Sequence, residues 1–120
     1  MKASDLRIGN LVYNVLKEVI TVDSIRDAGV NGYSIETIKP IPLTEEWLLK
    51  FGFDKYRTDK AINYKKGLLR FTFANKGVFK GKNFLMIANI INYKNINHVH
   101  QLQNLYFALT GEELKLKEND

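Results

Sequence analysis

Apolar and polar residues alternate with a period of two through the first forty residues of the chain. The alternation covers Leu11–Tyr13 after a Gly9-Asn10 turn, Val19–Ile25, and Tyr33–Ile38 after an Asn31-Gly32 turn. Such a period is typical of half-buried strands, and Asn-Gly is a strong hairpin signal. These segments therefore predict three antiparallel strands.

The C-terminal segment has a helical period instead. Its pattern predicts an amphipathic helix over residues 97–111 that packs on a core, with Asn97 as its N-cap and Gly111 as its left-handed C′ residue. The polar face is expected to hold mostly Gln101, Gln103 and Asn104. One apolar face is formed by Val99, Leu102, Leu105, Tyr106 and Leu109.

Between these two regions, Pro40 and Pro42 end the first sheet, because proline cannot donate to a strand ladder. Residues 44–52 predict a short helix that is capped by Thr44 and turns its only tryptophan, Trp47, toward the core. Residues 53–96 predict a second, hairpin-built sheet. Its expected strands are Ala61–Tyr64, Leu68–Phe73 and Phe84–Tyr93, the last of them covered on both faces.

Together these elements predict an α+β fold in one compact domain over residues 1–120, with mostly antiparallel sheets. Residues 1–43 look like the start of a small SH3-like barrel. Residues 112–120 form a charged tail. We find no internal repeat and no linker-like composition, so the sequence offers no support for a division into two domains.

Two blocks carry a resemblance to a known family. Pro40–Phe53 and Val99–Leu114 resemble the signatures of a family of small, uncharacterised proteins from phages and prophages of Bacteroides-type bacteria. The resemblance implies a phage accessory protein that acts in the host cytoplasm and counters host defence. It implies no particular reaction.

The composition is that of an ordinary globular protein, with 45% hydrophobic and 26% charged residues in 120. No apolar run is long enough for a membrane span, and Met1–Leu6 lacks the order of a secretory signal. The chain contains no cysteine, which excludes disulfides and thiolate chemistry. We therefore expect a cytoplasmic protein without membrane contact.

The charge is concentrated in the middle of the chain. Residues 55–82 contain nine basic side chains and the single acid Asp59, interleaved with aromatic residues. Cations beside aromatic rings favour a phosphate-bearing ligand, either a nucleotide or a nucleic acid. A lysine-rich solvated face is the alternative. The exposed binding set is predicted to be Tyr64, Lys65, Lys66, Arg70, Lys80 and Lys82.

Catalytic and metal sites are not expected. His98 and His100 point in different directions on a helix, and no further ligands complete a tetrahedral site. The adjacent carboxylates at residues 45–46 and 112–113 already have a structural explanation at helix ends, and no catalytic motif is present. The sequence therefore predicts a non-catalytic binding protein without a cofactor or a metal.

A second class of function stays open at this point. A protein-interaction or oligomeric structural module would bind a host or phage protein or a second copy of the chain, and would have no small-molecule ligand. Its contact is expected to use Tyr106, Phe107 or Ile90.

Overall fold

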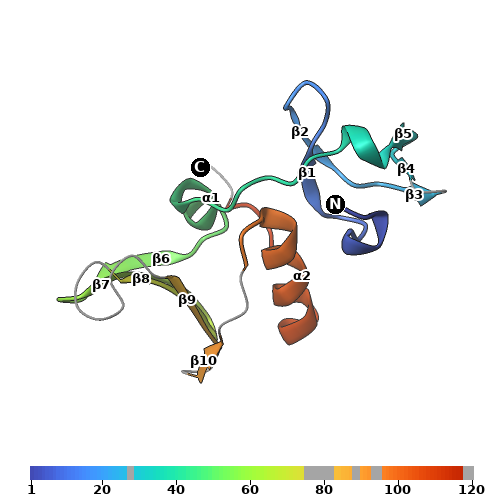
Figure 1. Ribbon diagram of the computed structural model, residues 1–120. Coiled ribbons are helices and arrows are strands. Elements are labelled where there is room, and N and C mark those ends of the chain that lie inside the picture. Colours follow the sequence, from blue (N-terminus) through green and yellow to red (C-terminus); the bar gives the residue numbers. More distant parts are fainter. Residues whose placement is uncertain (27–28, 75–82, 88–89, 93–95, 118–120) are drawn as a thin grey trace. The chain divides into compact units, whose positions relative to one another are not determined.

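The computed structural model describes residues 1–26, 29–74, 83–87, 90–92 and 96–117 (Figure 1). The chain divides into two compact units. Unit 1 comprises Met1–Leu43 and Asn97–Leu114, and unit 2 comprises Thr44–Ile96 and Lys115–Asp120. The chain thus leaves unit 1 after the N-terminal strands, forms most of unit 2, and returns to unit 1 with its C-terminal helix.

The described strands pair antiparallel in three sheets, and two α-helices accompany them. The predicted α+β class with mostly antiparallel sheets is therefore confirmed. The assignment of residues 1–120 to a single domain and the SH3-like character of residues 1–43 stay predictions.

Unit 1 begins with two small sheets whose antiparallel strands follow the predicted period of two. In the first, Leu11 pairs with Thr21 and Tyr13 with Val19. The elements are the 3-10 helix η1 (Ala3–Asp5), β1 (Leu11–Tyr13), β2 (Val19–Thr21), β3 (Ile25–Arg26), β4 (Gly29–Val30), β5 (Tyr33–Ser34), the 3-10 helix η2 (Ile35–Thr37) and α2 (Val99–Thr110). One buried cluster joins both sheets, formed by Leu6, Val12, Val22, Val30 and Ile38.

The Asn31-Gly32 turn is confirmed, with φ of 53° at Asn31 and 82° at Gly32. Both values lie in the left-handed region that a type I′ hairpin turn requires. The Asn31 side chain also accepts hydrogen bonds from two backbone N–H groups, at 2.7 Å from Asp23 and 3.1 Å from Ser24. Its amide donates to the Thr21 carbonyl oxygen at 2.9 Å. One side chain therefore ties the turn to the end of β2.

The prediction of one strand over Val19–Ile25 is wrong, because these residues are divided between β2 and β3 of two different sheets. The predicted third strand is also shorter than expected. The prediction of a strand over Tyr33–Ile38 is wrong after Ser34, where the chain enters η2. The Ser34 hydroxyl accepts a hydrogen bond from the Glu36 N–H, and the Thr37 hydroxyl donates to the Ser34 carbonyl oxygen. These local bonds compete with the strand ladder, which a hydrophobic period does not reveal.

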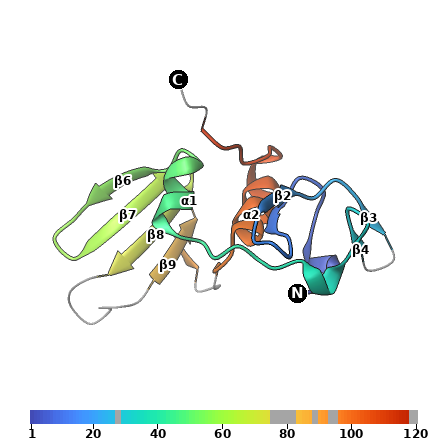
Figure 2. The same cartoon turned by 90° about the horizontal axis from the view of Figure 1, so that it is seen from above.

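Helix α2 belongs to unit 1 and lies beside its N-terminal strands (Figure 2). Val99 and Leu102 are fully buried, whereas Leu109 is 41% exposed, so only the first half of the predicted apolar stripe is covered. The helix ends at Gly111 with φ of 74°, as predicted. The predicted N-cap is wrong by one residue, since His98 occupies that position.

The predicted polar face of α2 is also wrong in part, because Gln103 is 2% exposed. Its side-chain oxygen accepts a hydrogen bond from the Leu11 N–H at 2.8 Å, and its amide donates to the Gly9 carbonyl oxygen at 3.2 Å. The neighbouring Asn104 oxygen accepts from the Asn10 amide and from Arg7 Nε, at 2.8 and 3.2 Å. Polar side chains of α2 thus provide hydrogen-bond partners for backbone and side-chain groups just before and at the start of β1.

Unit 2 is a five-stranded antiparallel sheet with a short helix on one face (Figures 1 and 2). The strand order is β10-β9-β8-β7-β6, so neighbours in sequence are neighbours in the sheet. Gly52, with φ of 84°, ends the turn that follows the helix. The elements are α1 (Glu45–Lys50), β6 (Asp54–Arg57), β7 (Ala61–Lys66), β8 (Leu69–Ala74), β9 (Asn83–Ile87) and β10 (Ile90–Asn92).

The expected single strand Phe84–Tyr93 is wrong. It forms the hairpin of β9 and β10 instead, in which Ile87 pairs with Ile90. The apolar run Phe84–Ile91 contains the single Asn89 and no Asn-Gly or Pro-Gly pair that would mark a reversal, so the pattern does not locate the hairpin.

The core of unit 2 lies between α1 and the sheet. Trp47 and Phe51 are buried as predicted, and Phe53 packs edge-on against Phe71 of β8 with ring centroids 6.0 Å apart. Tyr64 and Phe73 meet on the same face at 5.6 Å. We call this side of the sheet the helix-covered face.

Candidate phosphate-binding face

The opposite side of the sheet carries a second set of polar side chains. Directly opposed residues of antiparallel strands project to the same side. Lys65 of β7 lies opposite Arg70 of β8, which lies opposite Met86 of β9. We call this side the polar face and define it by Asp54, Tyr56, Asn63, Lys65, Arg70, Thr72 and Met86.

Lys65 and Arg70 form the cationic part of the polar face. Like charges directly opposite across a ladder repel each other, so this pair favours an anion between or above the two groups. Asp54 lies opposite Lys65 on its other side, on edge strand β6. No ion pair joins Asp54 to Lys65 in the part of the chain that the structure describes.

Tyr56 lies across the sheet toward this cationic pair. It is directly opposite Asn63, yet its hydroxyl reaches Arg70 Nη1, two strands away, at 3.4 Å. Asn63 is only 4% exposed, and its oxygen accepts a hydrogen bond from the Thr72 hydroxyl at 2.8 Å. Tyr56 itself is 37% exposed. Tyr56 therefore shares a side of the sheet with the buried Asn63 and keeps part of its own surface open to solvent.

The Arg70 guanidinium has weak partners. Nη1 donates to the Tyr56 hydroxyl through a long bond, and Nη2 contacts the Met86 sulfur, a poor acceptor. Nε is shielded from solvent and has no partner among the described residues. A phosphate offers charge-assisted bonds that are about twice as strong as neutral ones. Arg70 therefore has much to gain from an anionic ligand.

Tyr64 and Lys66 are on the helix-covered face, away from Lys65 and Arg70. The prediction that Tyr64 is exposed is wrong, because the residue is 3% exposed. Burial, followed by the nearby charge of Glu45, raises the pKa of Tyr64. Lys66 Nζ donates to the Phe51 carbonyl oxygen at 2.8 Å. Both residues thus serve the packing of α1.

The other predicted residues, Lys80 and Lys82, lie outside the described residues. Lys55 pairs with Glu45 of α1, and this hydrogen bond lowers the pKa of Glu45 and raises the pKa of Lys55. The basic residues of β6 to β8 are thus divided between two faces and an ion pair. Lys65 and Arg70 are the described members of the predicted set that the structure brings together.

The two units differ strongly in charge. Unit 2 has thirteen basic and six acidic side chains, a net charge of +7. Unit 1 has five basic and seven acidic side chains, a net charge of −2. An anionic ligand is therefore attracted to unit 2, where the polar face is located.

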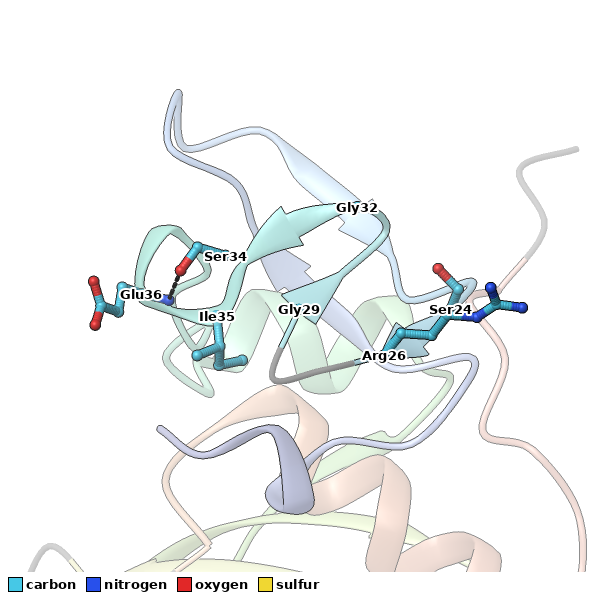
Figure 3. Close-up of a pocket in the computed structure, with 7 residues that line it drawn as sticks. All are labelled: Ser24, Arg26, Gly29, Gly32, Ser34, Ile35 and Glu36. Carbon is cyan, nitrogen blue, oxygen red and sulfur yellow. Dashed lines mark hydrogen bonds between the residues drawn. The ribbon is translucent and has the colours of Figure 1, made fainter.

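Unit 1 contains an open cavity of about 770 Å³ beside the sheet of β3, β4 and β5 (Figure 3). Figure 3 shows Ser24 and Arg26 on one side and Glu36 on the other, with the two charged groups pointing apart. The Ser34 hydroxyl is already bonded within η2. The polar groups of this cavity do not converge on a common point, so it is the weaker candidate site.

The expectation that His98 and His100 point in different directions is wrong, because the two rings stack with centroids 5.8 Å apart. His98 is the N-cap with an extended backbone, so the helical geometry assumed for the pair does not apply to it. His100 is 5% exposed, and its Nδ1 has no hydrogen-bond partner within the described ranges. Burial, followed by the charge of His98, lowers the pKa of His100. Among the residues that the structure describes, no group of three or more histidines and carboxylates is placed to hold a metal ion.

The residues expected at a protein contact are only partly available. Phe107 is 39% exposed, and the Arg7 guanidinium lies 4.3 Å from its ring centroid. Tyr106 is half-buried. The side chain of Ile90 lies outside the described part. Phe107 thus makes an intramolecular cation–π contact and stays partly exposed.

Comparison with protein-family models, with curated proteins and with solved structures gives no match for this chain. The resemblance to phage proteins thus stays a prediction. Within the described ranges, neither helix is long and apolar enough to cross a membrane.

Sequence reasoning missed Tyr56 as a site residue and selected Tyr64 instead. Both tyrosines belong to strands in a basic region, so composition treats them alike. The pairing of Tyr56 with Asn63 and of Tyr64 with Phe71 separates them. The feature that distinguishes Tyr56 is its register beside polar residues. This register is known only once the strands are paired.

Proposed function

We propose that this protein is a non-catalytic phage accessory protein whose unit 2 binds a phosphate-bearing ligand, a nucleotide or a nucleic acid, on the polar face. The resemblance of two sequence blocks to phage proteins supports the accessory role and the countering of host defence. The observation that carries the binding proposal is the cross-strand pair Lys65 and Arg70 in a unit of net charge +7.

The proposal predicts a strong dependence on salt. Binding of single strands weakens with a slope of about −0.7 per neutralised phosphate on logarithmic axes. For two to four phosphates, the affinity falls by about 7- to 50-fold between 50 and 200 mM salt. Fluorescence anisotropy with labelled oligonucleotides, nucleotides and cyclic dinucleotides measures this change.

The double variant Lys65→Gln, Arg70→Gln tests the face itself. Each charge-assisted bond contributes about 1.5 to 3 kcal/mol, so we expect the affinity to fall by about tenfold or more. The matched control is Lys17→Gln, Lys39→Gln, which removes two exposed cations from unit 1. We expect this control to change the affinity by less than about threefold, through the long-range field alone.

The outcome against the proposal is clear. If the wild-type protein binds no nucleotide, cyclic dinucleotide, single strand or duplex at 50 mM salt, the basic residues serve solubility. An equal loss of affinity in both double variants also contradicts the polar face as the binding site.

A protein-interaction module is the alternative, and the turn between β1 and β2 favours it. Val15 and Leu16 are each 74% exposed at its tip. The Asn14 side-chain oxygen accepts hydrogen bonds from the N–H groups of Leu16 and Glu18, both at 2.9 Å, which holds the turn in one conformation. Light scattering of the wild type and of Val15→Asn, Leu16→Asn tests self-association. A concentration-dependent dimer that is lost in the variant supports this function.

A further inference from the structure

The phenol ring of Tyr56 has an unusual position on edge strand β6. Neighbouring strands are about 4.8 Å apart, so a contact between β6 and β8 spans roughly 10 Å of sheet. Tyr56 bridges this distance with the help of Arg70, whose Nη1 lies 3.4 Å from the phenol oxygen. Its hydroxyl end therefore points from β6 toward β8, on the side of the sheet to which Asn63 projects.

A ring in this position offers a flat surface for stacking. An exposed tyrosine that projects freely loses side-chain entropy when a ligand orders it. The contact of its hydroxyl with Arg70 already restricts the Tyr56 side chain, which stays 37% exposed. The ring is therefore preorganised to stack on a planar group.

Basic residues are present on both sides of the ring along the strand direction. Lys65 follows Asn63 by two residues along β7, a distance of about 7 Å, and is paired with Arg70 of β8. These two cations therefore lie on one side of Tyr56 along the strand direction. In the other direction, Lys60 is exposed in the turn between β6 and β7. A mononucleotide carries phosphate on one side of its base, whereas a polymer carries phosphate on both sides.

We propose that the ligand of the polar face is a single-stranded nucleic acid, with one base stacked on Tyr56 and its flanking phosphates near Lys65, Arg70 and Lys60. This inference rests on the proposed function of unit 2 and names its ligand. Stacking on a side chain requires an unpaired base, so a duplex is a poor ligand for this surface. Every base has a planar face, so binding is tolerant of sequence.

The test measures the anisotropy of fluorescein-labelled dT8 and U8 at 50 mM salt, with dTMP and a DNA duplex as competitors. Loss of one stacked base costs about 1 to 3 kcal/mol, so Tyr56→Ala weakens binding by about 5- to 150-fold. Tyr56→Phe keeps the ring and stays within about threefold of the wild type. The matched control Tyr33→Ala removes a tyrosine that is 63% exposed in unit 1, and binding is unchanged.

Tyr56→Leu retains apolar cover over Asn63 without an aromatic ring, and it replaces Tyr56→Ala if thermal melting shows that the alanine variant does not fold. Wild-type affinity in the folded variant overturns the inference, as does a loss in Tyr56→Phe equal to that in Tyr56→Ala. Competition by dTMP or by duplex as strong as that by dT8 overturns it too. If Lys65→Gln, Arg70→Gln weakens binding while Tyr56→Ala does not, this inference falls and the proposed function stands. If no phosphate ligand binds at all, both fall.

Discussion

Gln103 provides a sharp test of how α2 is held in unit 1. Its side chain is 2% exposed and bonds to backbone groups on both sides of Asn10, the Gly9 carbonyl oxygen and the Leu11 N–H. The amide thus replaces a neighbouring strand at this point. Truncation by Gln103→Ala leaves one donor and one acceptor without their partner.

The size of the effect follows from these two bonds. An unsatisfied, shielded polar group costs about 1 to 3 kcal/mol, so we expect Gln103→Ala to destabilise unit 1 by about 2 to 5 kcal/mol. Gln101→Ala is the matched comparison on the same helix. The Gln101 oxygen accepts from the N–H groups of Asn97 and His98 at the N-terminus of α2, and loss of such a cap costs about 1 kcal/mol.

Urea unfolding followed by circular dichroism measures the difference. At a typical m-value of about 2 kcal/mol/M, the midpoint for Gln103→Ala falls by about 1 to 2.5 M. Hydrogen exchange of the peptides that contain Leu11 and α2 locates the loss in unit 1, whereas Trp47 fluorescence reports on unit 2. A shift in Gln103→Ala no larger than that in Gln101→Ala refutes the reasoning, since the amide would then be replaceable by water.

Three further predictions concern unit 1. Leu102→Ala, at a fully buried position, should cost about 2 to 5 kcal/mol in urea unfolding, and equal costs for Leu102→Ala and the half-buried Leu105→Ala would contradict the packing of α2. Because burial lowers the pKa of His100, the unfolded state binds the proton more readily. Stability should therefore be complete above the ordinary histidine pKa of about 6.5 and decrease below it, and His100→Phe should flatten this pH dependence between pH 7.5 and 5.5. Asn31→Ala should lower the melting temperature more than Asn31→Gly, since both variants lose the three side-chain bonds but only alanine is strained at φ of 53°.

Positions with a left-handed backbone were readable from the sequence. Asn31-Gly32 adopts positive φ at both residues, and Gly111 ends α2 in the left-handed region. These conformations depend on the residues themselves, because few side chains tolerate them. The period of two likewise separated Phe71 from Arg70 correctly, since neighbouring residues of a strand point to opposite faces.

Long-range partners were not readable. Gln103 belongs to the polar side of an amphipathic pattern, but its partners lie more than ninety residues earlier in the chain. The hairpin of β9 and β10 was hidden for a related reason, because an apolar run is compatible with one long strand or two short ones.

The candidate site, too, was determined partly by the sequence and partly by long-range contacts. Sequence alone determined that the middle of the chain is basic and that its strands have two faces. It did not determine which face is covered, because that depends on where α1 packs. With Trp47, Phe51 and Phe53 on one side, Tyr64 becomes a core residue. The pairing of β6 with β7 then leaves Tyr56 beside Lys65 and Arg70, since strand register, and not composition, decides which side chains share a surface.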